Sequence, residues 1–425
     1  MVGSSFRRWV EGLNGPAFTA REIRVICAMF LCIAPIALGF VLVFGPRLAP
    51  TAGLAELGGD FPAFYMSGRL LNHYPSSRLY DLQLQERLLL EVRPAEQGLR
   101  LPYLHPPFLA VVFRPFALLP YAWAYAAWSA TSLGLYIAGL LAMLRHFGPF
   151  NKPDKGTALL LALSFEPFLA ETLAGGQVSS IAFLCLALAI SSERRARPFS
   201  SGVFLSLCLY RPTLLTLILP MLVFSRRWRM LVGFGVGGAV LLTATALTMG
   251  PSVIADYVRT TTHFGGLYLG GNAVLRVWKF VDLRAFVTLL TGEYMLGLLV
   301  VVAAACWALP SLIRTWWTTN GTDMRGPARI WALTIAWMLV LNLYVPFYDC
   351  ILLVLVFILM AHTLSGPSNV RHEPAFRWLM LLTFVTAWVS QPMARISGMQ
   401  IFTLVLILVA VYVGGVRVER DAVSR

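Results

Sequence analysis

The sequence predicts an all-α, polytopic membrane protein. Of its 425 residues, 58% are hydrophobic and only 13% are charged, and the apolar residues gather in long runs. A soluble globular protein is usually about 45–50% apolar and about 25% charged. We therefore expect one integral membrane domain over residues 1–425, built as a helical bundle with about ten to twelve membrane helices plus re-entrant and interfacial helices.

Ten apolar runs come close to the length that a membrane-spanning helix needs, about 17–25 residues. They lie at residues 23–44, 121–144, 156–172, 177–192, 230–249, 294–313, 328–346, 350–365, 375–390 and 398–415. The first run is too long for the core of a signal peptide, so we expect it to stay in the protein as an uncleaved helix.

The net charge of +14 comes from Lys and Arg clustered in short loops between the apolar runs. This positive-inside pattern explains the charge without a nucleic-acid partner and orients the chain. It predicts that both termini lie in the cytoplasm, and we expect the protein in the plasma membrane, as a multi-pass protein of the bacterial inner membrane. The loops that then face the cytoplasm contain residues 7–24, 145–155, 194–197, 314–329 and 371–377, and the two large outer loops are 45–120 and 250–293.

The apolar segment 200–224 has basic residues at both ends. A hairpin or re-entrant pair that turns near Arg211-Pro212 would keep both ends in the cytoplasm, because proline interrupts a helix and an arginine inside an apolar run needs a purpose. A single crossing is the alternative. In the second outer loop we favour an interfacial helix, although 272–291 could also span or re-enter. Gly233 and Gly237 predict close helix packing.

Asp60 is the most informative residue of the first outer loop. It follows Gly58-Gly59 and precedes an aromatic cluster that includes Phe64. Glycines permit a close approach between the backbone and a ligand, which favours a binding or catalytic role for Asp60. The alternative is that Asp60 caps a helix. We expect Asp81 to cap the amphipathic helix 82–92, which has the composition of a helix lying at the membrane interface.

Residues 108–120 form an apolar run of only about a dozen residues, too short to span a bilayer. We expect a re-entrant helix that enters from outside. Arg114 would face protein or a lipid headgroup, and His105 would lie at the mouth of the helix, in a structural or a site role.

Other polar groups are expected at outer helix ends or inside the membrane, where an ionisable side chain is a functional hypothesis and a buried ion pair is the alternative. They are Glu166, Glu171, Gln177, Arg211, Asp256, His263, Asp349, Gln391 and Arg395. The six cysteines show no disulfide or metal-ligand spacing, and no nucleotide motif is present. We therefore expect no metal and no cofactor.

In chain order these residues resemble glycosyltransferase family 87, a GT-C-type family of transferases that use polyprenyl-phosphate sugars. The pattern is Asp60-Phe61-x-x-Phe64-Tyr65-x-x-Gly68, Leu79-Tyr80-Asp81, Tyr103-x-x-Pro106-Pro107-Phe108, Pro115, Pro120, Gly176-Gln177, Arg211-Pro212, Asn272 and Pro346-x-Tyr348-Asp349. It covers about residues 56–365. Three positions depart from the family: His105 replaces an aromatic residue, Arg211 replaces the more frequent lysine, and Pro62 is unexpected beside Asp60.

The resemblance implies transfer of a hexose, mannose first, from a polyprenyl-phosphate donor to a hydroxyl group of a glycolipid or glycan acceptor on the outer face. It implies Asp60 as the general base. We expect Arg211 and Arg114 to bind the donor phosphate. We expect the sugar or acceptor site to be lined by Tyr65, Asp81, His105, Gln177, His263 and Asp349. One base that helps displace a lipid phosphate predicts inversion at the anomeric carbon.

Two other functions remain open. A transporter or flippase for a lipid-linked glycan would use similar features, and so would a non-catalytic partner in envelope assembly. A transporter should carry its ionisable residues near the bilayer midplane, often within internal repeats. The sequence shows no repeat, and Asp60 is expected in an outer loop, so we favour the enzyme.

Overall fold

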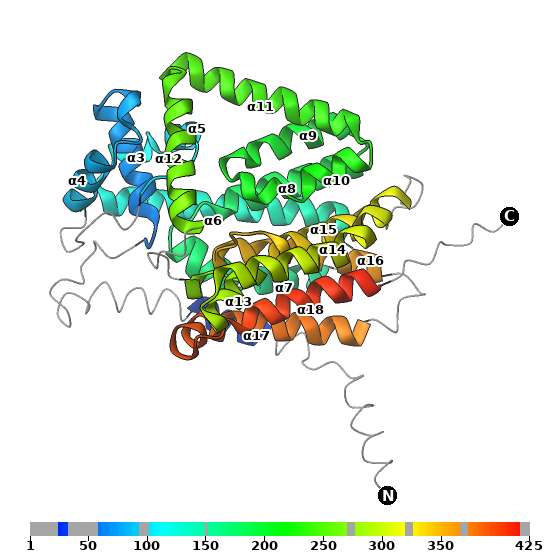
Figure 1. Ribbon diagram of the computed structural model, residues 1–425. Coiled ribbons are helices and arrows are strands. Elements are labelled where there is room, and N and C mark those ends of the chain that lie inside the picture. Colours follow the sequence, from blue (N-terminus) through cyan, green and yellow to red (C-terminus); the bar gives the residue numbers. More distant parts are fainter. Residues whose placement is uncertain are drawn as a thin grey trace, which may run out of the picture. The chain divides into compact units, whose positions relative to one another are not determined.

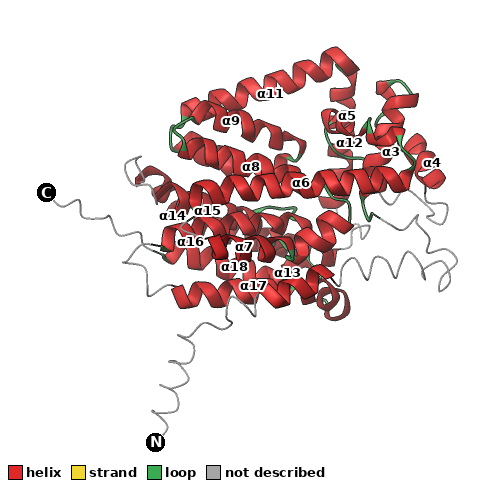
Figure 2. Cartoon of the chain, turned by 180° about the vertical axis from the view of Figure 1, so that it is seen from behind, coloured by secondary structure: helices red, strands yellow, loops and turns green. Residues whose placement is uncertain are grey.

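The computed structural model describes residues 24–32, 58–92, 102–148, 152–269, 277–318, 326–365 and 373–416. In these residues the fold is all-α, and their only β-type pairing is an isolated bridge between Phe280 and Pro346 (Figures 1 and 2). The all-α prediction is confirmed. Most of the predicted first span, from residue 33 to residue 44, and Asn272 lie outside the described residues.

The chain divides into two compact units. The first unit contains Met1–Leu31, Met143–Glu166 and Val277–Arg425, and the second contains Cys32–Ala142 and Pro167–Arg276. We describe each unit by itself. The prediction of one integral membrane domain stays a prediction.

Five helices in the described part of the chain are long and apolar enough to cross a membrane. They are α6 (Tyr121–Phe147), α11 (Trp228–Met249), α14 (Tyr294–Thr318), the continuous segment Phe347–Leu364, and Pro374–Ser397 of α17 (Glu373–Ser397). A sixth span is possible if Lys155–Leu163 and Pro167–Ala174, bent by 52°, cross as one. The polytopic membrane prediction is confirmed. The number of long helices is below ten because several predicted runs form helices of fewer than 18 residues.

The second unit begins with the short helices of the first outer loop. These are α3 (Phe61–His73), η2 (Ser76–Arg78), α4 (Leu82–Val92), α5 (Pro107–Phe113) and η3 (Phe116–Leu118). Helix α4 has the predicted bounds, and it buries Leu84, Leu88 and Leu89 on one side. Arg69 on α3 forms an ion pair with Glu91 on α4 (3.1 Å). With seven residues, α5 is too short to cross a bilayer, as the sequence predicts.

The segment after α8 (Ser179–Arg194) has the break that the sequence predicts. Its elements are α9 (Pro198–Ser206), η5 (Leu207–Tyr210), η6 (Pro212–Leu215) and α10 (Ile218–Phe224), so the helices are interrupted at Arg211. Arg227, after α10, forms an ion pair with Glu193, before α9. Both ends of the segment therefore lie together, as a hairpin requires and a single crossing does not allow.

Helices α9 and α11 pack with almost no space between their backbones. A Cβ added to Gly233 would lie 2.1 Å from the Phe199 carbonyl oxygen, and one added to Gly237 would lie 2.1 Å from the Ser206 hydroxyl. The predicted role of these two glycines in helix packing is confirmed. Helix α12 (Ser252–Leu269) follows α11, and the Ser76 hydroxyl donates to the Met249 carbonyl (2.6 Å), which ties the end of α11 to η2.

The first unit is organised around α15 (Gly326–Leu341), which is buried along nearly its whole length. Helices α14, α16 (Leu353–Leu364) and α18 (Ile401–Gly415) pack against it. The Trp316 indole nitrogen donates to the Thr334 hydroxyl (3.0 Å) between α14 and α15. The remaining described elements of this unit are α7 (Lys152–Leu163), η7 (Val277–Lys279), α13 (Leu283–Thr291) and η8 (Phe347–Leu352). Helix α13 has only nine residues, which fits the predicted interfacial helix.

Candidate functional site

Two glycine turns of the second unit meet at Asp60. The Asp60 backbone nitrogen donates to the Gly175 carbonyl (3.0 Å), and Gly59 and Gly176 both have positive φ. A Cβ added to Gly59 would lie 2.8 Å from the Gly175 oxygen, and one added to Gly176 would lie 2.5 Å from the Cβ of Phe61. Only glycine fits this approach without strain. The predicted glycine context of Asp60 therefore has a structural use: it brings residues 58–60 against 175–177.

The Asp60 carboxylate does not cap α3, although Asp60 stands at the N-cap position. A capping side chain accepts from the second or third backbone N–H of its helix. Pro62 removes the second, and the Ala63 N–H donates to the Asp60 backbone carbonyl (3.1 Å). The carboxylate instead accepts a hydrogen bond from the Gln177 side-chain amide. The unexpected Pro62 thus helps to free the carboxylate for another task.

Gln177 is positioned by a π-helix and by α6. The element η4 (Pro167–Ala174) is a π-helix, and its hydrogen-bond pattern continues past Ala174, since the Gln177 N–H donates to the Thr172 carbonyl (2.9 Å). From α6, the Tyr125 hydroxyl donates to the Ala174 carbonyl (2.7 Å) and the Trp128 indole donates to the Gly176 carbonyl (3.1 Å). π-helical structure is rare in proteins and is often found at functional sites.

Arg211 is bound by Ser179, which lies two residues after Gln177 in the same segment. Its guanidinium donates to the Ser179 hydroxyl (3.5 Å), and the residue is only 5% exposed. The Tyr210 hydroxyl donates to the Val178 carbonyl (3.0 Å) and accepts from the Ala182 N–H (3.1 Å). The Cα atoms of Gln177 and Ser179 are at most about 7 Å apart, because they are two residues apart. A carboxylate and a guanidinium are thus both bound by one three-residue stretch.

His105 belongs to the same group of residues. Its Nδ1 lies 3.4 Å from the Tyr210 carbonyl, and its own carbonyl accepts from the Tyr80 hydroxyl (2.7 Å). The imidazole packs near the rings of Phe64 (5.2 Å between centroids) and Tyr103 (5.8 Å). Burial and the nearby Arg211 guanidinium lower the pKa of His105 to about 3, so the ring is neutral at physiological pH.

Four other residues predicted for the site have different surroundings. Arg114 is exposed and donates to the Asn72 side chain (3.0 Å) at the far end of α5 from His105. The Tyr65 hydroxyl donates to the Leu119 carbonyl (2.8 Å). Asp81 accepts from the Leu84 N–H (3.1 Å), which is the predicted cap, and it pairs with Arg78 (2.8 Å). His263 is exposed on α12. Roles for these four in substrate binding stay predictions.

Asp349 belongs to the first unit. It is 2% exposed, at the start of the segment Phe347–Leu364, and its carboxyl group and that of Glu166 both interact electrostatically with the Cys350 thiol. The sequence singled out Asp349 and Glu166 as membrane-embedded acids, and burial of both is confirmed. The participation of Asp349 in the site around Asp60 stays a prediction.

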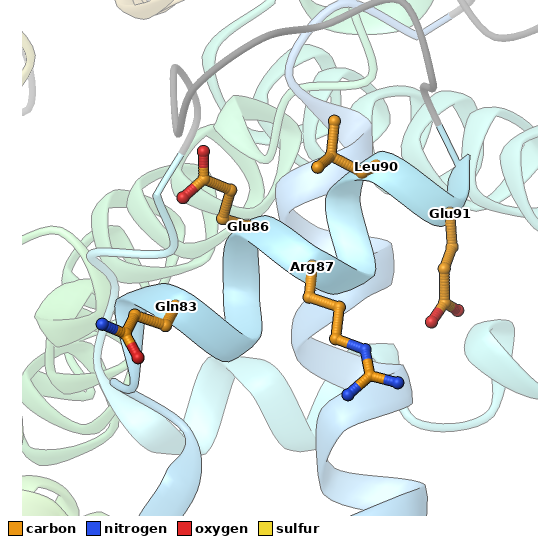
Figure 3. Close-up of a pocket in the computed structure, with 5 residues that line it drawn as sticks. All are labelled: Gln83, Glu86, Arg87, Leu90 and Glu91. Carbon is orange, nitrogen blue, oxygen red and sulfur yellow. The ribbon is translucent and has the colours of Figure 1, made fainter.

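Sequence reasoning did not select Tyr210 and Ser179. Tyr210 directly precedes Arg211, and Ser179 follows Gln177 by two residues, so both lie beside residues that it did select. It also missed Asp282, which lies in the stretch 272–291 predicted to be interfacial and is fully buried. The hollow drawn in Figure 3 is lined by α4 alone, through Gln83, Glu86, Arg87, Leu90 and Glu91, and these side chains do not converge on one point. No group of three His, Cys, Asp or Glu side chains in the described residues could hold a metal ion.

Fold and site together define a membrane-embedded helical protein in which one short segment, residues 177–179, binds both a carboxylate and a buried arginine. Its sequence matches the family profile of Glycosyltransferase family 87 over residues 103–346. This chain belongs to glycosyltransferase family 87. The matched range contains His105, Gln177 and Arg211, and it begins after Asp60.

Two curated relatives are similar to this chain. Both are called "Alpha-(1->3)-arabinofuranosyltransferase", from Mycobacterium tuberculosis strains CDC 1551 / Oshkosh and ATCC 25618 / H37Rv. Each is 26% identical over 302 residues, which is 67% of this chain and 63% of the relative. The chain thus aligns with less than two thirds of the length of these relatives. No solved structure matches it significantly.

Proposed function

We propose that this protein transfers a glycosyl residue from a polyprenyl-phosphate donor to a hydroxyl group of a glycolipid or glycan, with Asp60 as the general base. The observation that carries the proposal is the placement of Asp60. Its carboxylate is released from capping α3 and bound by Gln177, two residues from the Ser179 that holds Arg211.

The chemistry needs these two charges close together. A carboxylate removes the proton from the acceptor hydroxyl as that oxygen attacks the anomeric carbon. The leaving group is a phosphate, which needs positive charge nearby and no general acid. Arg211 supplies that charge. With one base and direct displacement of the lipid phosphate, the configuration at the anomeric carbon is inverted.

The proposed site faces the outer side of the plasma membrane, with both termini in the cytoplasm, as the positive-inside pattern predicts. The hairpin 198–224 has the basic residues Arg195, Arg197, Arg226 and Arg227 at its two ends, which lie together, and Arg211 at its turn. This arrangement supports the proposal that the donor phosphate reaches Arg211 from the outer side of the membrane, while the two ends of the hairpin lie on the cytoplasmic side.

Two sugars are candidates for the glycosyl residue that the protein transfers. The family resemblance suggests mannose, and the name of the curated relatives adds arabinofuranose. We propose that one of these two is transferred. A transporter of a lipid-linked glycan is the alternative function, and following the labelled lipid across a sealed bilayer separates it from the enzyme.

The test is sugar transfer by purified protein in lipid nanodiscs. The donors are radiolabelled polyprenyl-phosphate mannose and polyprenyl-phosphate arabinofuranose, and the acceptor is a membrane-lipid extract. Wild type should transfer one sugar, and Asp60→Asn should lose about 10²-fold or more of kcat/KM because it lacks a base.

Glu86→Gln is the matched control, because Glu86 is a partly exposed carboxylate of the same unit that lies on α4. It should transfer sugar at the wild-type rate. Equal transfer by wild type and Asp60→Asn would remove Asp60 as the base. Movement of the labelled lipid across the bilayer of sealed proteoliposomes, with no sugar transfer, would favour the transporter.

A further inference from the structure

We propose that His105 recognises a hydroxyl group of the sugar on the donor lipid, by accepting a hydrogen bond through Nε2, and so determines which sugar the site takes. The inference rests on the proposed function, because it assigns a specificity role within the same site.

The hydrogen bond at Nδ1 fixes the tautomer of the ring. The Tyr210 carbonyl can only accept, so Nδ1 carries the hydrogen (3.4 Å). In a neutral imidazole the other nitrogen is then an acceptor. Burial and Arg211 keep the pKa of His105 near 3, so this form persists at physiological pH. In the described part of the chain no residue donates to Nε2, His105 is only half-buried, and Nε2 is not among the buried polar atoms that lack a partner. The acceptor is therefore open to a ligand.

The His105 ring lies between the two chain segments that carry the reacting groups. On one side, the His105 ring lies close to Phe64, which follows Asp60 by one helical turn and shares its side of α3. On the other, it is bonded to Tyr210, the residue before Arg211, whose charge acts on the imidazole. A sugar whose phosphate is bound by Arg211 and whose anomeric carbon faces the oxygen activated by Asp60 would therefore lie against His105.

The chemistry of the acceptor selects the sugar rather than the phosphate. At neutral pH the phosphate diester of the donor has no hydrogen to donate, whereas every sugar hydroxyl has one. A protonated His105 would instead add a second positive charge next to Arg211 and bind phosphate. A site built to bond a hydroxyl discriminates strongly against a ligand that lacks it, because the buried polar group is then left unpaired.

The test compares binding of a lipid with and without its sugar. The affinity of protein in nanodiscs is measured for polyprenyl phosphate and for the sugar-bearing lipid that wild type transfers. His105→Phe keeps an aromatic ring and removes the acceptor. It should weaken binding of the sugar-bearing lipid by about 10-fold and leave binding of polyprenyl phosphate within about twofold. His73→Phe, an exposed histidine at the end of α3, is the control and should change neither.

His105→Asn separates recognition from support of the fold. Its amide NH₂ is placed like Nδ1–H and can still donate to the Tyr210 carbonyl, but it lacks an acceptor at the Nε2 position. It should therefore show the same sugar-specific loss as His105→Phe. Wild-type affinity of His105→Asn, or an equal loss for both lipids, would overturn the proposal and make His105 structural. If wild type transfers neither sugar, the result counts against the proposed function. If wild type transfers a sugar but binds that sugar-bearing lipid no more tightly than polyprenyl phosphate, only the inference about His105 is overturned.

Discussion

Asp60 and Asp282 occupy the same position in two helices, one in each unit, yet their carboxylates are used differently. Asp282 caps α13 by accepting from the Ala285 N–H (2.9 Å), and it also accepts from the Val345 N–H (3.1 Å). Asp60 precedes α3 and caps nothing. Asp282 is fully buried, while Asp60 is only partly buried. A carboxylate that is fully used by backbone N–H groups stabilises the fold, and one released from that duty is available for chemistry.

The largest expected difference is between Asp60→Asn and Asp282→Asn. Asp60→Asn should lose about 10²-fold or more of the transfer activity with little change in melting temperature. Asp282→Asn should lose one of two buried hydrogen bonds and about 2 kcal/mol of stability, with transfer per folded molecule nearly unchanged. Transfer assays and thermal unfolding of both variants in detergent measure this. A large stability loss in Asp60→Asn would mean that the two acids do the same job.

A smaller effect is expected for Gln177→Leu, which keeps the size of the side chain and removes the amide that binds Asp60. The carboxylate would lose its orientation while the phosphate site stays intact. We expect kcat to fall about 10-fold with a nearly unchanged KM for the donor. Steady-state kinetics against donor concentration measure both constants. An unchanged kcat would show that the bond to Gln177 does not orient the base.

Tyr210→Phe should act on the donor rather than on the base. It removes the hydroxyl that bonds Val178 and Ala182, which ties the hairpin turn to the start of α8 and so positions Arg211. We expect the KM for the donor to rise about 3- to 10-fold with a small change in kcat. The opposite split, a lower kcat at constant KM, would place Tyr210 with the base.

The smallest expected effect is on the pH dependence of stability. The pKa of His105 is about 3 in the folded protein and about 6.5 in the unfolded chain. Between these values the unfolded chain binds a proton that the folded protein excludes, so stability falls as the pH decreases from about 6.5 toward 3. The melting temperature should therefore drop less between pH 7 and pH 5 in His105→Phe than in wild type. Equal drops would contradict a neutral His105.

The helices of this protein could be predicted well from its sequence, because length and apolar composition decide where a membrane helix forms. Helix 82–92 has the predicted bounds, and the break at Arg211-Pro212 lies where an arginine and a proline interrupt an apolar run. Whether the Asp60 side chain caps α3, in contrast, could be judged only from the structure. The answer depends on which backbone N–H groups of Pro62 and Ala63 are available to it.

Long-range pairing explains the rest of what the sequence could not predict. The bond between Asp60 and Gln177 joins residues 117 positions apart, and no periodicity indicates which outer helix ends meet. The sequence shows glycines beside Asp60 and beside Gln177, but it does not indicate that these two glycine turns lie against each other. The burial of Asp282 was missed for the same reason, since its second partner, Val345, is 63 positions away.

The π-helix before Gln177 makes the site sensitive to chain length as well as to side-chain identity. A π-turn contains one residue more than the α-helical turn that it replaces. Removal of a single codon within 167–174, for example that of Ala170, would take away a residue that this hydrogen-bond pattern needs, since the Gly175 N–H donates to the Ala170 carbonyl and the Gln177 N–H to the Thr172 carbonyl. The turn that sets Gln177 beside Asp60 would then be disturbed although every residue of the site is still encoded. The length of this segment is therefore as much a part of the site as any of its side chains.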